Sequence, residues 1–279
     1  RNLILDVATF KFLTLGNSIM EFVNQVLSTA GPPLIAIFFT SIDDTFIFFS
    51  MPGVHALSVL FAFLFFIRFK EKKNVEENES NNKKTLMDGI SYSYNFINIR
   101  ILLILTSTIL FWGLTQPLIP RISKDILDAG SGGYAILLST GALGAMIGSI
   151  TLPLAQSFFR NSKSIVLCIT CYSITLIGLA LSKSIVLSGI FLGLGGFFHL
   201  IWFTVIIILL QTLPDENHRG RVVGLFFTFV QLYGLGFIIG GALGDTIGIN
   251  PTIYIASSSL IAIHLICFIS SSSFRSLKS

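Results

Sequence analysis

Long apolar stretches constrain this sequence of 279 residues more than any other feature. The hydrocarbon core of a bilayer is about 30 Å thick, and an α-helix needs about 20 mainly apolar residues to cross it. Only 11% of the residues are charged, against about 25% in soluble globular proteins. The sequence therefore predicts an all-α integral membrane protein and excludes a water-soluble enzyme. About eight transmembrane helices are expected, at residues 17–39, 46–68, 98–120, 132–157, 164–181, 185–211, 221–243 and 251–270.

The basic residues lie in the short connections between these stretches. If successive connections alternate between the two sides of the membrane, all but three of the 18 Lys and Arg residues fall on one side; the exceptions are Arg121, Lys124 and Lys183. Cytoplasmic connections carry an excess of Lys and Arg, so the richer side is predicted to be cytoplasmic and to hold both ends of the chain. Topology thus explains the net charge of +4, and no nucleic-acid partner is expected.

One hydrophilic insertion divides the chain. Residues 69–85, FKEKKNVEENESNNKKT, carry too much charge and Asn to bury a core. They predict a cytoplasmic central linker, assigned to residues 69–97. The linker separates residues 1–68, with an interfacial segment and two spans, from a six-helix bundle at residues 98–279.

The sequence contains none of the short motifs typical of a membrane enzyme or an ATP-driven exporter, such as HExxH, GxSxG or GxxxxGK[ST]. Cys168, Cys171 and Cys267 all lie within apolar stretches, where neither a disulfide framework nor a zinc site is expected. No catalytic residue, metal or cofactor is predicted.

Polar side chains recur along one face of two predicted spans. In the first span they are spaced i, i+4, i+7, i+8 and i+11, and comprise Asn17, Glu21, Asn24, Gln25 and Ser28; in the third span, a similar face holds Thr108, Trp112, Thr115 and Gln116. Because polar groups are costly in hydrocarbon, these faces are expected to point inward. They either hydrogen-bond between helices or line a watery cavity.

Two further features point to chemistry inside the membrane. Glu21 is the one acidic residue well inside a span, so it is a candidate for proton coupling; alternatively it reaches the interface or pairs with Lys11. His199 and Trp202 lie one helical turn apart, where an indole beside an imidazole suits an amphipathic, cationic or aromatic solute. The alternative for His199 is a hydrogen bond between helices.

Two regions resemble the major facilitator superfamily. Residues 213–225, LPDENHRGRVVGL, and the glycine-rich residues 234–245, GLGFIIGGALGD, resemble the part of this family from its tenth to its eleventh helix. They are similar in particular to the bacterial exporter branch that includes macrolide-efflux and enterobactin-export proteins. Gly31 and Pro32 resemble the Gly-Pro-x-x-Gly-Gly signature of the fifth helix of the family's antiporters, although Ile35 and Ala36 stand where that signature has two glycines.

The resemblance implies a fold and a function. The eight spans would correspond to helices five to twelve of the family, so that the chain is a fragment without the first four helices. It implies a secondary transporter of the bacterial cytoplasmic membrane that works by alternating access and is a monomer when complete. Its partners would be the lipid bilayer, a small-molecule substrate and protons, and its expected activity is proton-coupled efflux of small amphipathic, drug- or siderophore-like molecules. Import of a small nutrient and an inactive fragment are the open alternatives.

The resemblance also assigns roles to residues. The first, third and seventh spans correspond to helices that line the family's central path, and in the seventh span Gln231 is preferred to Tyr233, which is expected to face away. The expected cavity residues are Asn24, Gln25, Trp112, Gln116, His199, Trp202 and Gln231. Topology or a cytoplasmic gate is expected to depend on Arg219, Arg221 and Asp215. Close helix packing is expected at Gly31, Pro32, Gly144, Gly148 and Gly240.

Overall fold

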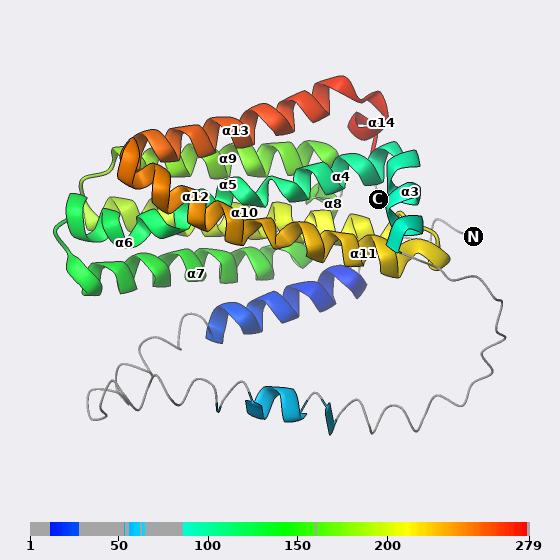
Figure 1. The fold of residues 1–279 in the computed structure, drawn as a ribbon, viewed down its shortest axis with the longest axis horizontal. Helices are drawn as coiled ribbons and strands as arrows, with labels where there is room; N and C mark the ends of the chain where they lie inside the picture. Colours follow the sequence, from blue (N-terminus) through cyan, green and yellow to red (C-terminus); the bar gives the residue numbers. More distant parts are fainter. Residues whose placement is uncertain are drawn as a thin grey trace. The chain divides into compact units, whose positions relative to one another are not determined.

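The computed structural model describes residues 12–27, 53, 56–61, 63–64, 86–159 and 161–277 (Figure 1). Arg1–Thr29 and Thr85–Ser279 belong to one compact unit, and Ala30–Lys84 to a second. In the first unit, residues 12–27 form one helix. The remaining helices of this unit are α3 (Leu86–Asn95), α4 (Ile97–Ser107), α5 (Ile109–Thr115), η1 (Gln116–Leu118), α6 (Ile119–Arg121), η2 (Ile122–Ile126), α7 (Gly130–Leu154), α8 (Gln156–Phe159), α9 (Ser162–Leu181), α10 (Ile185–Thr212), α11 (Glu216–Val230), α12 (Leu232–Thr246), α13 (Ile249–Ser270) and α14 (Ser272–Arg275).

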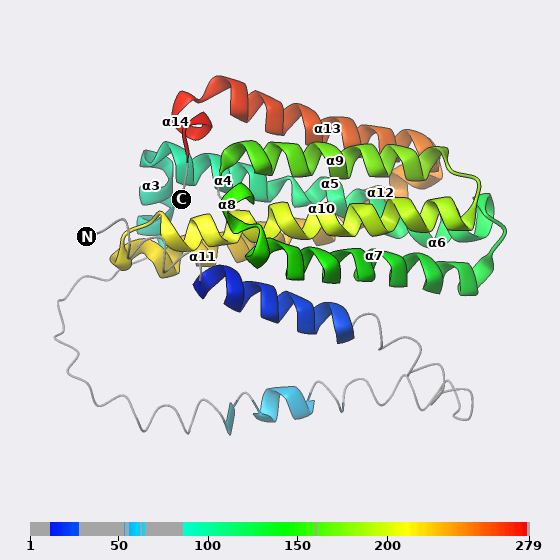
Figure 2. The ribbon, with the colours of Figure 1, turned by 180° about the vertical axis from the view of Figure 1, so that it is seen from behind.

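Six of the predicted spans are confirmed as helices. Within the residues that the structure describes, six helices are long and apolar enough to cross a membrane: Ile97–Ile126, Gly130–Leu154, Ser162–Leu181, Ile185–Thr212, Glu216–Thr246 and Ile249–Ser270. They lie side by side along one direction in both ribbon views (Figures 1 and 2). The other two predicted spans, 17–39 and 46–68, lie mostly outside the described residues.

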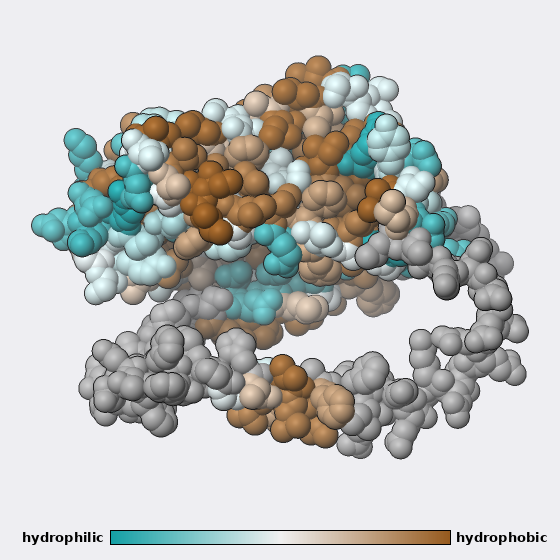
Figure 3. Space-filling model, in the orientation of Figure 1, coloured by the Kyte–Doolittle hydropathy of each residue, from teal (hydrophilic) through white to brown (hydrophobic). Residues whose placement is uncertain are grey.

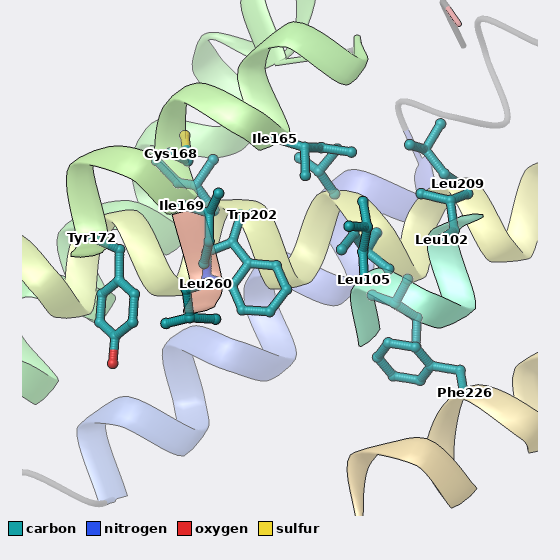
Figure 4. Packing of buried hydrophobic residues seen from close by; sticks show 14 of the residues in the cluster. Leu102, Leu105, Ile165, Cys168, Ile169, Tyr172, Trp202, Leu209, Phe226 and Leu260 are labelled. Atoms are coloured by element: carbon teal, nitrogen blue, oxygen red, sulfur yellow. The ribbon is translucent and has the colours of Figure 1, made fainter. Parts of the chain in front are cut away.

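The six helices are apolar on the inside and on the outside. A buried cluster joins α4, α9, α10 and α13 through close packing of side chains such as Leu105, Ile169 and Leu260 (Figure 4). On the outside, Ile147, Ile174 and Ile238 are 55%, 56% and 70% exposed. Brown apolar side chains cover much of the flank in Figure 3, and hydrophilic ones gather near the two ends. Such a surface is suited to lipid and not to water.

Two of the long spans are interrupted. The first departs from a regular α-helix at Thr108, whose N–H bonds to the Leu105 carbonyl three residues back. It becomes irregular again at η1, where Pro117 lies in the first turn. The span Glu216–Thr246 is interrupted at Gln231, whose N–H likewise bonds to the Thr228 carbonyl. In a membrane, irregular backbone is tolerated where it is buried in protein or lines a cavity. Thr108 is buried in the bundle, as this rule requires, whereas Gln231 is exposed.

Two pairs of helices approach each other through glycines. Between α7 and α10, a methyl group at Gly144 would collide with the Gly193 carbonyl, and one at Gly148 would press on Phe197. Between α5 and α12, a methyl group at Gly240 would collide with Leu114. Small residues let helix backbones come close in membranes. The structure thus places Gly144, Gly148 and Gly240 at helix contacts, whereas Gly31 and Pro32 lie outside the described residues.

Candidate functional site

A cavity of about 460 Å³ lies among the helix of residues 12–27, α5, α7, α9 and α10. Its volume falls within the range of about 300–1,000 Å³ found for small-molecule sites. Most of its wall is apolar, with a few polar side chains among leucines, isoleucines and glycines. The polar and amphipathic residues that line it are Glu21, Gln25, Trp112, Thr115, Gln116, Tyr172, Thr175 and His199.

Residues 12–27 contribute to this cavity through an anchored helix. The side-chain amide of Asn17 donates a hydrogen bond of 3.0 Å to the Gln211 side-chain oxygen near the end of α10. One turn further along, Glu21 lines the cavity and makes a side-chain hydrogen bond with Gln25. The polar stripe predicted for the first span thus carries one contact between helices and two cavity residues.

Four rings from three helices form a continuous row of ring contacts, which we call the aromatic wall: Tyr233, Trp112, His199 and Phe203. The ring centroids of Trp112 and His199 are 4.6 Å apart, with an angle of 21° between the planes. Tyr233 lies 4.7 Å from Trp112, and Phe203 lies 6.0 Å from His199 at 13°. Three of the four line the cavity, the exception being Tyr233. The wall therefore presents aromatic surface to any molecule inside.

His199 holds an unused hydrogen-bonding group in this wall. Its Nε2 is buried and has no hydrogen-bond partner among the described residues. Leaving a buried polar group unpaired costs about 1–3 kcal/mol. A ligand in the cavity that pairs with this nitrogen would recover that free energy, so His199 is suited to a polar contact.

The structure brings together five of the residues expected to act in transport: Glu21, Gln25, Trp112, Gln116 and His199 all line the cavity. The other cavity candidates, Asn24, Trp202 and Gln231, lie outside the lining. The agreement is best for the third span, whose predicted polar face, Trp112 to Gln116, supplies three lining residues.

Asn24 and Gln231 are exposed and lie outside the lining. Gln231 occupies the interruption between α11 and α12. Tyr233, which was expected to face away, instead contacts the Trp112 ring at a tilt of 36°. The predicted face itself is turned outward, because Gly224 and Thr228, which precede the interruption, are exposed as well.

Trp202 belongs to the hydrophobic core and not to the cavity. It is 1% exposed and packs near Ile169 and Leu260, between α9, α10 and α13 (Figure 4). Its ring meets the edge of the His264 ring, with centroids 5.8 Å apart. Because it follows His199 by only three residues, the sequence placed both on one face, but the indole points deeper into the bundle.

Sequence reasoning missed the contribution of α9. Tyr172 and Thr175 line the cavity together with Leu176 and Leu179. Their spacing of i, i+3, i+4 and i+7 defines one helical face and would have revealed them. Phe203 was also missed, although it lies about one helical turn after His199 and also lines the cavity.

The end of the bundle that the sequence assigns to the cytoplasm is held by a cluster of contacts around Asp215. This carboxylate caps α11 by accepting a hydrogen bond of 3.0 Å from the His218 N–H, and it also meets His218 Nδ1 at 2.6 Å. The Tyr92 ring of α3 stacks on the His218 ring, with centroids 4.0 Å apart and a 5° angle. The Asp215 N–H donates to the Tyr92 hydroxyl at 3.2 Å. These contacts fix α3 to the start of α11.

The predicted gate residues are thus arranged around a histidine. The partner of Asp215 is His218, and among the described residues neither Arg219 nor Arg221 makes an ion pair within 4.0 Å. Arg219 is exposed, and the Cβ of Arg221 packs against Gly89 of α3.

The cap at Asp215 is expected to depend on pH. The hydrogen bond from His218 lowers the pKa of the Asp215 carboxyl below its ordinary value of 3.8. A depressed carboxyl pKa stabilises the folded cap above pH 3.8, and this contribution is lost as the pH falls through the folded value. The protection factors of the amides at residues 216–220, which correct for the pH dependence of intrinsic exchange, should therefore fall below about pH 4. In Asp215→Asn, which still caps the helix, this acid-dependent loss of protection should be absent; if it persists unchanged, another group is responsible.

The opposite end of the bundle carries an ion pair that the sequence did not reveal. The Arg121 guanidinium lies 2.8 Å from the Asp245 carboxylate and 3.8 Å from that of Asp125. The first contact joins the ends of the two interrupted spans. Both partners are substantially exposed, so the pair contributes little to stability.

Comparison with known proteins identifies the family. The family model described as Major Facilitator Superfamily matches residues 1–235, which is most of the chain. No curated protein matches it individually. The match agrees with the all-helical membrane bundle and with a cavity in its interior. This chain therefore belongs to the major facilitator superfamily of secondary transporters.

Proposed function

We propose that the protein exports small amphipathic molecules from the bacterial cytoplasm in exchange for protons, by alternating access, with both ends of the chain in the cytoplasm. The observation that carries this proposal is the aromatic and largely apolar cavity enclosed by the membrane-spanning helices. Apolar walls with a few placed polar groups suit a molecule that is partly apolar itself. Protons that enter the cell down their electrochemical gradient supply the driving force for export.

Glu21 is the proposed proton-coupling group. It lines the cavity, and it is the only residue of the described lining with an acidic side chain. A carboxyl group in a membrane interior binds and releases protons as its surroundings change between open and closed states. In alternating access, the same site faces each side of the membrane in turn. The cytoplasmic cluster of Asp215, His218 and Tyr92 is proposed to stabilise one of these states.

The proposal is tested by dye efflux from cells that express the protein from its native gene. Three probes are used: the neutral N-phenyl-1-naphthylamine, the anionic 1-anilinonaphthalene-8-sulfonate and the cationic ethidium. Energised cells are expected to expel at least one of them faster than cells without the protein, and a protonophore should abolish the difference. Glu21→Gln should abolish it as well, while the protein remains in the membrane.

Three outcomes would contradict parts of this proposal. Faster accumulation in energised cells would make the protein an importer, which is the alternative for a member of this family. Efflux that resists protonophores and follows ATP would remove proton coupling. Energised transport that is unchanged in Glu21→Gln would remove the role of that residue.

A further inference from the structure

We infer that the cavity selects a monovalent organic cation with aromatic rings and rejects organic anions of the same size and shape. This inference names the substrate class within the proposed function and rests on it. The single carboxylate of the cavity, the rings of its wall and its neutral polar groups support it.

The charge of the cavity is one-sided. Among the lining residues that the structure describes, Glu21 is the one with an acidic side chain, and no Lys or Arg is present. Charges interact more strongly in a low-dielectric interior than in water. An ionised Glu21 therefore attracts a cation, whereas an anion would be buried beside a like charge without a partner, which is strongly unfavourable.

The aromatic wall favours the same class of ligand. The face of an aromatic ring is negative, so cations are attracted to rings within about 6 Å, and indole is the best of them. Trp112 supplies an indole to the lining, and Phe203 a phenyl ring. Flat rings of a ligand also gain from offset stacking on such a wall. The Glu21 carboxylate and the rings of the wall together form a site that suits a ligand with one positive charge and aromatic rings.

The remaining polar groups are neutral and fit this assignment. The lining also holds amide and hydroxyl groups, from Gln25, Thr115 and Gln116. These groups can hydrogen-bond to both donors and acceptors on a ligand. They do not compensate the charge of Glu21. A neutral ligand would displace water from that carboxylate without replacing its solvation, which costs free energy. A cation avoids this cost, and the cavity therefore prefers it to a neutral ligand of equal size.

The inference is tested with two ions that differ in the sign of their charge. Tetraphenylphosphonium and tetraphenylborate both carry four phenyl rings around one central atom, but the first is a cation and the second an anion. Binding of each is measured by equilibrium dialysis on the protein expressed from its native gene and purified in detergent, without a proton gradient. Saturable binding of tetraphenylphosphonium is expected, at least about tenfold tighter than that of tetraphenylborate.

Two variants assign the selectivity to the carboxylate. Glu21→Gln should weaken tetraphenylphosphonium binding about tenfold and bring the two ions to similar affinity. Asp128→Asn makes the same chemical change in an exposed turn outside the lining, and it should leave both affinities unchanged. Because the wild-type comparison of the two ions needs no variant, the test does not depend on the folding of Glu21→Gln.

Several results would overturn the inference. They are equal or tighter binding of tetraphenylborate by the wild type, binding of neither ion, and unchanged selectivity in Glu21→Gln. The efflux test decides the proposed function independently. If energised cells with the protein expel no dye faster than cells without it, transport is contradicted even if tetraphenylphosphonium binds. Conversely, protonophore-sensitive efflux of the neutral or anionic dye without cation selectivity would uphold the exporter and refute its substrate class.

Discussion

Replacing Gly144 by leucine is expected to abolish transport while the protein still inserts into the membrane. The helix α7 meets α10 at this position, where even a single methyl group would collide with the Gly193 carbonyl. Overpacking of a tight contact typically costs about 1–3 kcal/mol, and a leucine side chain would force the two helices apart. Transport is measured by dye efflux, insertion by the amount of protein in the membrane, and stability by thermal unfolding in detergent.

A matched pair of alanine substitutions separates this contact from helix propensity. Gly241 of α12 has no atom within 4 Å of a Cβ built on it. Alanine is favoured over glycine in a helix by about 1 kcal/mol, so Gly241→Ala should leave the unfolding temperature unchanged or raise it. Gly144→Ala should lower it. If both substitutions shift the unfolding temperature in the same direction, the close approach of α7 and α10 does not explain the glycine.

Replacing Trp112 by alanine is expected to weaken substrate binding and reduce transport without removing the fold. Trp112 lies in the aromatic wall between Tyr233 and His199, and it lines the cavity. Its loss removes a cation–π contact of about 0.5–2 kcal/mol. At about 1.4 kcal/mol for each tenfold change, the affinity for tetraphenylphosphonium should fall about 2- to 30-fold.

Two controls restrict the interpretation of this result. Phe227 of α11 is 54% exposed and lies outside the lining, so Phe227→Ala should leave transport unchanged. Trp112→Phe keeps a ring in the wall and should retain part of the activity. A Trp112→Ala protein with normal affinity and transport would show that the wall does not contact the substrate.

The spans of the bundle were predictable from the sequence because a membrane imposes a simple requirement on length and polarity. Hydropathy located the six spans now seen as helices, and the polar spacing in 108–116 predicted the cavity face of that span. Hydropathy depends only on the length and polarity of a stretch. The polar spacing depends on helical periodicity, which is kept closely enough through η1 that Trp112, Thr115 and Gln116 all line the cavity.

The errors of prediction concern which way a helical face points and how deep a side chain reaches. Gln231 was placed in the cavity because a helix aligns it with Thr228 and Gly224, but all three residues are exposed and lie outside the lining. Trp202 was placed there because spacing along one helix does not show how deep a side chain reaches among its neighbours. The Arg121–Asp245 pair joins positions 124 residues apart, and no local pattern reveals such a contact.

The coincidence of the two interruptions has a mechanical consequence. Leu110 lies against Gly236, and Leu114 against Gly240, so the paired spans run in a constant register that sets Thr108 within about one turn of Gln231. On one side of this level α5 is fastened to α12; on the other, α4 and α3 adjoin α11. The neighbouring breaks at Thr108 and Gln231 therefore give both spans a place to bend at nearly the same depth, between segments that are packed against different partners.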